Sequence, residues 1–131
     1  MSLRTILAAQ CFVAALVTGT VAQAAADDYS FEPVQVEVKR GDGVTVAVRL
    51  IDKATKKPVP DAVIIEKRID MAPEDMASMD SPLTAVPSEE PGVYAFKTDL
   101  TMAGRWRLSL AARVQGEPET VKSEVVFKAT P

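Results

Sequence analysis

Histidine is absent from the sequence, and cysteine occurs once, at Cys11. Because histidine is the usual general base at neutral pH and the commonest ligand of Zn²⁺ and Cu(II), its absence argues against acid–base catalysis and against metal sites of that kind. Without such a base, serine and threonine hydroxyls cannot be activated in a catalytic triad. If Cys11 is removed with a leader, the mature chain has no thiol for a disulfide, a metal thiolate or nucleophilic catalysis. We therefore expect a protein that is not an enzyme.

Long apolar runs are also lacking, apart from one near the N-terminus. Ile6 to Val17 follow the positively charged Arg4, and Ala22-Gln23-Ala24 is a small-x-small cleavage site. This arrangement predicts a secretory signal peptide at residues 1–24. The run is shorter than the roughly 20 residues of a membrane span. We expect a mature protein that is soluble, periplasmic or secreted, and without a membrane span after cleavage.

Positive charge is in slight deficit, with 15 lysines and arginines against 18 aspartates and glutamates and a formal net charge of −3. Nucleic acid and anionic lipid are therefore poor partner candidates. About 105 residues remain after cleavage, enough for one domain with one core. We expect residues 25–33 to be a linker and residues 34–131 to be that domain.

The mature chain is dominated by apolar and polar residues that alternate with a period of two. Val34, Val36 and Val38 share one face, which is the pattern of a half-buried antiparallel strand. A turn at Gly41-Asp42-Gly43 would then lead into a second strand. In all, seven strands are predicted, at residues 34–39, 44–52, 62–70, 83–86, 93–98, 106–114 and 121–128. Short alternating strands without a helical period are typical of an immunoglobulin-like antiparallel β-sandwich.

Several side chains have predicted places in this sandwich. Val63, Ile65 and Ile69 should face the core from the third strand. Trp106 is interpreted as the core anchor, with stacking over a bound cation as the alternative. Tyr94, which follows Pro91-Gly92, is interpreted as a corner tyrosine whose hydroxyl bonds to the backbone.

Residues 71–82 combine three methionines with the acidic residues Glu74, Asp75 and Asp80. Thioethers suit the soft cations Cu(I) and Ag(I), so Met71, Met76 and Met79 are candidate metal ligands, with Met102 as an outside candidate. Asp75 or Asp80 could offset charge nearby. The carboxylates lack the spacing of a calcium loop and are interpreted as a solvated acidic loop.

The alternative for the methionines is packing, since methionine fills irregular gaps in a core. Strand alternation assigns Met71 and Met102 mainly to the core. Met76 and Met79 would lie together on a helical turn near residues 74–78, and they are the better ligand candidates.

A further set of motifs runs in order through most of the mature chain: Val59-Pro60-Asp61-Ala62 before a strand, methionines at that strand's end, Pro91-Gly92-Val93-Tyr94, and Met102-Ala103-Gly104-Arg105-Trp106. In their order and spacing they resemble the YtkA-like (FixH-like) family. The resemblance implies an immunoglobulin-like sandwich and a non-catalytic envelope accessory protein, associated with heavy-metal efflux or with copper handling around terminal oxidases. Relatives often carry a denser methionine, glycine and histidine cluster, whereas this loop has acidic residues and no histidine.

Two functional hypotheses follow. The first is a periplasmic, non-enzymatic accessory protein that binds or handles Cu(I) or Ag(I) in an efflux or oxidase-maturation system. The second is a protein-interaction module that docks on an envelope complex through a strand edge or the acidic methionine loop, without binding metal.

Overall fold

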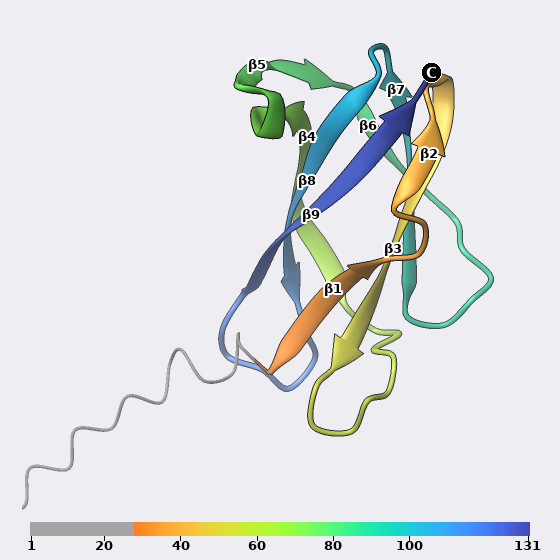
Figure 1. The fold of residues 1–131 in the computed structure, drawn as a ribbon. Coiled ribbons are helices and arrows are strands. Elements are labelled where there is room, and N and C mark those ends of the chain that lie inside the picture. The colour runs from red at the N-terminus through yellow and green to blue at the C-terminus, as the bar shows by residue number, and fades with distance from the viewer. Residues whose placement is uncertain (1–27) are drawn as a thin grey trace, which may run out of the picture.

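The computed structural model describes residues 28–131, so the predicted signal peptide at residues 1–24 lies outside the described residues. The described chain forms nine strands and one short 3₁₀ turn, arranged as two packed sheets (Figure 1). This is the predicted all-β, immunoglobulin-like sandwich. Within residues 28–131, no helix is long and apolar enough to cross a membrane.

The first sheet has four strands and is antiparallel throughout. Its spatial order is β1 (Tyr29–Pro33), β3 (Gly41–Asp52), β7 (Val93–Leu100) and β6 (Leu83–Val86). The second sheet has five strands, in the order β2 (Glu37–Lys39), β9 (Val121–Thr130), β8 (Gly104–Arg113), β4 (Val63–Met71) and β5 (Met76–Ser81). In this sheet β2 runs parallel to β9, and the other neighbours are antiparallel.

Between the sheets lies one apolar core, formed by alternate residues of the long strands. Its fully buried large side chains are Val46, Val48, Leu50, Ile69, Met71, Phe96, Leu100, Trp106, Leu108, Val121 and Phe127. Burying a side chain of this size contributes about 1.5–3 kcal/mol relative to leaving it exposed. The prediction for Trp106 is confirmed: its ring is fully buried, and its Nε1 donates to the carbonyl of Met102 at 3.0 Å. A buried ring has no free face for a cation from solvent.

The corner tyrosine is also confirmed. The Tyr94 hydroxyl donates to the carbonyl of Val59 at 2.7 Å and accepts from the amide of Ala62 at 3.0 Å. It thereby fastens the connection between β3 and β4 to β7. Burial raises the pKa of Tyr94, since the charged form would be desolvated.

The N-terminal boundary of the sandwich differs from the prediction. Residues 29–33, assigned to a linker, form β1, which pairs with β3 and places Phe31 in the core. Val34 and Val36 are 40% and 57% exposed, so their predicted inward orientation is wrong, whereas Val38 packs against the core. The chain instead crosses from β1 in one sheet to β2 in the other. Gly41-Asp42-Gly43 is not a hairpin turn but the start of β3, where the register with β7 shifts.

A second difference lies in β4. Val63 and Ile65 were predicted to face the core, but they are 61% and 45% exposed, whereas Ile69 is buried as expected. The reason is a register shift between Ile64 and Glu66 in the pairing with β8. One extra residue in a strand reverses the side-chain alternation beyond it. Ile64 therefore packs against the core in place of its neighbours.

Candidate functional site: the methionine strand

Two of the predicted ligand residues, Met71 and Met76, lie where β4 ends and the chain reverses into β5. Pro73 lies at the start of the 3₁₀ turn η1 (Ala72–Glu74), and Asp75 has a left-handed backbone with φ of 59°. The Asp75 amide donates to the carbonyl of Ala72 at 3.0 Å. This tight reversal starts β5, the methionine strand, which returns antiparallel along β4 at the outer edge of the five-stranded sheet (Figure 1).

Met71 and Met76 are brought together by this reversal. They are paired residues of β4 and β5. The Met71 side chain is fully buried, as strand alternation predicted, and its Cε faces Gly104, where an added Cβ would lie 3.0 Å from it. Met76 is half-buried and packs against the core. Met71 therefore presents its thioether to the interior, and Met76 is the more accessible of the two.

Met79 and Met102 lie elsewhere. Met79 is half-buried on β5. The helical turn predicted at residues 74–78 is absent, because the 3₁₀ turn ends at Glu74 and the backbone from Met76 onward is extended. Met76 and Met79 are therefore not stacked on one helical face. Met102 is 40% exposed, so its assignment to the core is wrong. The alternation of β7 ends at Leu100, and Met102 falls in the turn before β8.

The acidic residues of this segment are only partly solvated as predicted: Asp75 and Asp80 are exposed, but Glu74 and Asp80 are bonded to arginines. Glu74 accepts from the backbone amide of Arg105 at 3.1 Å and from its Nε at 2.8 Å, while Arg105 Nη2 donates to the carbonyl of Pro73 at 2.8 Å. These hydrogen bonds hold the pKa of Glu74 below its usual range. The side chain of Arg105, on β8, thus ties down the turn that precedes the methionine strand.

A second arginine fastens the strand itself. Arg68, on β4, donates from Nη2 to the carbonyl of Ala77 at 2.8 Å and from Nη1 to Asp80 at 3.2 Å. Its Nε donates to Asp70 at 3.0 Å. We call Arg68 and Arg105 the arginine clamps. They lie on the two strands that β5 and η1 contact, and they engage both Glu74 and Asp80.

Asp70 is the buried centre of this network. Its side chain is fully buried, and it accepts from the Ala72 amide at 3.0 Å, from Arg68 and from Arg107 Nη2 at 3.1 Å. Burial alone would raise the pKa of Asp70, but the Ala72 amide and the two guanidinium groups outweigh it and hold that pKa below its usual value. Arg107 also lies 3.6 Å from Glu124 on β9, so the ion pairs from Asp80 to Glu124 extend across four strands.

The sequence did not identify Asp70 or the clamps as parts of this site. Their sequence signal is slight: Arg105 and Arg107 fall on the polar face of an alternating strand, which alone indicates only solvent exposure. A site for a hard cation would need a cluster of side chains that could bind it. Among residues 28–131, no group of three or more aspartates, glutamates, histidines or cysteines is placed to hold a metal ion.

Comparison with known proteins identifies the family to which the sequence is similar. The sequence model of the YtkA-like family matches residues 23–111, more than half of the chain. No curated protein matches the sequence. Among solved structures, the Lin-41 filamin domain is 16% identical, with 79% of this chain and 92% of that chain covered and a TM-score of 0.46. The ZirS C-terminal domain is 12% identical, with 100% and 83% covered and a TM-score of 0.43.

Proposed function

The chain belongs to the YtkA-like family, and on that premise we propose that it is an exported, non-enzymatic accessory protein that handles the soft cations Cu(I) or Ag(I). The observation that carries this proposal is the pairing of Met71 with Met76 at the start of a strand that also carries Met79. Three of the five methionines of the chain thus lie on the end of β4 and on β5, two of them directly paired. Thioethers select soft cations over Ca²⁺ or Mg²⁺.

The geometry assigns different roles to the three thioethers. Met76 and Met79 are half-buried on an edge strand and reach solvent without a change of fold. Met71 is buried beneath the turn and can ligate only if that turn lifts. We therefore expect two thioethers to give weak binding, and a tighter complex only when Met71 joins them.

A titration tests this proposal. The mature protein is titrated with Cu(I) under anaerobic conditions against a competing chelator, and with Ag(I) as a probe that is not redox-active. We expect a one-to-one complex that Met76→Leu with Met79→Leu abolishes, because leucine has a similar volume but no sulfur. Met102→Leu is the matched control, since it removes an exposed methionine outside β5. Failure to bind more tightly than micromolar, or equal binding by the double variant, would refute the metal proposal.

A second candidate, a protein-interaction module, is favoured by the edge of β4. Residues 63–68 pair with β8 on one side, but β5 covers only Ile69 to Met71 on the other. Among the described residues this leaves a strand edge with unpaired backbone groups, beside the exposed Val63 and Ile65. Such an edge can accept an extended segment of an envelope protein as an added strand.

Site-specific cross-linking in intact cells separates the two candidates. A photo-reactive residue at Val63 should give one discrete adduct if the edge docks a partner. The same residue at Val36, which is exposed just before β2 at the opposite edge of that sheet, is the control. The absence of any adduct specific to Val63 would leave the edge without support.

A further inference from the structure

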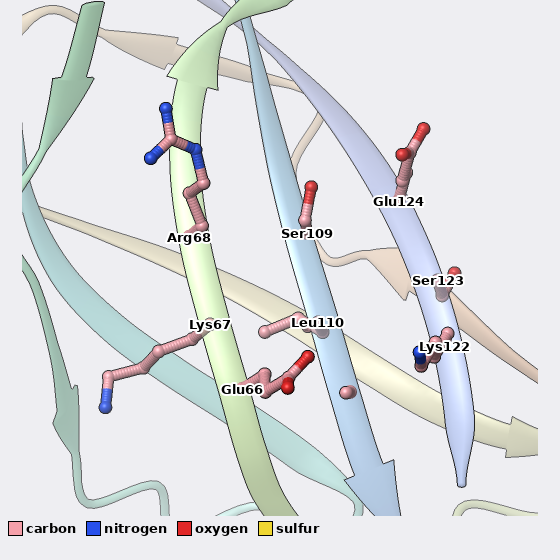
Figure 2. A pocket seen from close by; sticks show the side chains of 9 residues that line it. Glu66, Lys67, Arg68, Ser109, Leu110, Lys122, Ser123 and Glu124 are labelled. Carbon is pink, nitrogen blue, oxygen red and sulfur yellow. The ribbon is translucent and has the colours of Figure 1, made fainter. Parts of the chain in front are cut away.

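The outer face of the five-stranded sheet is hollowed between β4, β8 and β9. The hollow has a volume of about 590 Å³ and is open to solvent. Figure 2 shows the lining residues on three adjacent strands, with Glu66 and Arg68 on one side of β8 and Lys122 and Glu124 on the other. It lies on the face opposite the core and apart from the thioethers of Met71, Met76 and Met79.

The hollow exists because the central strand carries small side chains there. Ser109 and Ala111 form its floor on β8, and Ala111 is only 2% exposed although it faces outward. The flanking strands carry long charged side chains at the same level. In register, Arg68 of β4 and Glu124 of β9 flank Ser109, while Glu66 and Lys122 flank Ala111.

The charges of the two walls have opposite signs at each level. On the β4 wall Glu66 is negative and Arg68 positive, and on the β9 wall Lys122 is positive and Glu124 negative. Arg68 already forms ion pairs with Asp70 and Asp80. Glu124 already forms one with Arg107. Glu66 and Lys122, in contrast, have no ion-pair partner within residues 28–131, and both are exposed.

We propose that this face binds a second copy of the chain, related by a two-fold axis parallel to β8. That rotation turns the two faces toward each other and exchanges their walls, so Glu66 of each copy faces Lys122 of the other. A closed two-fold interface is self-complementary in this sense. The same rotation sets Arg68 opposite Glu124 of the second copy, which adds to the complementarity.

Distances and side-chain lengths suit this arrangement. Sheets that pack face to face lie about 10 Å apart, a gap that glutamate and lysine can bridge together. The small floor of each copy leaves room for the long side chains of the other. Val126, 44% exposed and on the same outer face of β9, supplies apolar surface beside Arg107. The interface is polar at its centre, so we expect weak, salt-sensitive association. It does not depend on metal binding.

Charge reversal tests the pairing. Sedimentation velocity of the metal-free mature protein, over a wide concentration range at low and high salt, should show a monomer–dimer equilibrium. Glu66→Lys and Lys122→Glu should each weaken dimerisation by about tenfold or more, since like charges then face each other. Mixing the two variants should restore association, because the lysine introduced in one copy then faces the glutamate introduced in the other.

The mixture distinguishes this axis from others. If Glu66 instead faced Arg68 of the second copy, the mixture would not regain the wild-type affinity, which would overturn the proposed geometry. Glu89→Lys and Lys53→Glu, in exposed loops away from this face, are the matched controls and should leave association unchanged. A wild-type protein that stays monomeric at millimolar concentration would refute the proposal. Circular dichroism of each variant confirms that a loss of dimer is not a loss of fold.

Discussion

Replacing Asp70 by asparagine tests how strongly the buried ion network holds the methionine strand. Asp70 is fully buried and accepts three hydrogen bonds, from the Ala72 amide, Arg68 and Arg107. Asparagine has nearly the same shape and keeps one carbonyl oxygen for the Ala72 amide. The substitution therefore removes the negative charge and its two bonds to arginine, with little change in packing.

The magnitude follows from the exposure of the partners. Hydrogen bonds to charged groups contribute about 1.5–3 kcal/mol each in general. The side chains of Arg68 and Arg107 are 50% and 30% exposed, so water replaces part of what Asp70 gives them. An exposed ion pair contributes only ~0–1 kcal/mol, so each of the two arginine bonds to Asp70 is taken at an intermediate value. Together they predict that Asp70→Asn lowers the free energy of unfolding by about 2 kcal/mol. Asp70→Ala also loses the bond to Ala72 and should cost about 3 kcal/mol.

The loss should depend on pH in a defined direction. The pKa of Asp70 is lowered in the folded state, so its contribution is present above the unfolded pKa of about 3.9 and disappears as pH falls through the folded pKa. The difference between wild type and Asp70→Asn should be full at pH 7 and shrink below pH ~4. Glu74, whose pKa is also lowered, is common to both proteins, so the subtraction isolates Asp70.

Urea unfolding followed by fluorescence measures this difference, because Trp106 is the only tryptophan and is fully buried. Asp42→Asn, at an exposed carboxylate, is the control and should change stability by less than ~0.5 kcal/mol. A loss for Asp70→Asn of the same size as that control, or one that does not vary between pH 7 and pH 3, would refute the reasoning.

Two further substitutions test the framework around the site. Tyr94→Phe should cost about 1–2 kcal/mol of unfolding free energy, because the Ala62 amide and the Val59 carbonyl lose their partner; an unchanged urea midpoint would contradict the corner role. Gly104→Ala should cost about 1–3 kcal/mol, because Gly104 has φ of +136° and an added Cβ would lie 3.0 Å from the Met71 methyl. Gly41→Ala is the control for Gly104→Ala, because a Cβ added at Gly41 would make only ordinary van der Waals contacts. An equal loss of unfolding free energy in both variants would exclude local strain at Gly104.

The strands were predicted best where the alternation is unbroken. From Trp106 to Ala112 every second residue of β8 is buried, and no register shift interrupts its pairing with β9. In β4, by contrast, the consecutive apolar residues Val63, Ile64 and Ile65 fit either face. Only the position of the register shift decides which of them faces inward, and that shift is set by the pairing with β8. Local alternation cannot reveal it.

The N-terminal strand was missed for a related reason. Tyr29 and Phe31 do alternate with polar residues, but the run is short and ends at Pro33. What makes it a strand is tertiary contact. Phe31 packs edge-on against Tyr94 with ring centroids 6.3 Å apart, and the Tyr29 hydroxyl donates to Glu117 at 2.9 Å. Burial and this bond raise the pKa of Tyr29 to about 12. None of these partners is near in sequence.

The same long-range pairing changes what the acidic residues can do for a cation. Read along the sequence, Glu74, Asp75 and Asp80 suggest a negative field beside the methionines. In the fold, Glu74 bonds to Arg105 at 2.8 Å and Asp80 to Arg68 at 3.2 Å, through residues of other strands. These two carboxylates are thereby paired with arginines and only the exposed Asp75 is left without an ion pair among residues 28–131, so the methionine strand would offer a cation little attraction beyond its thioethers. Selectivity there would favour cations that bind sulfur, and carboxylate-seeking cations such as Ca²⁺ would gain nothing from the site.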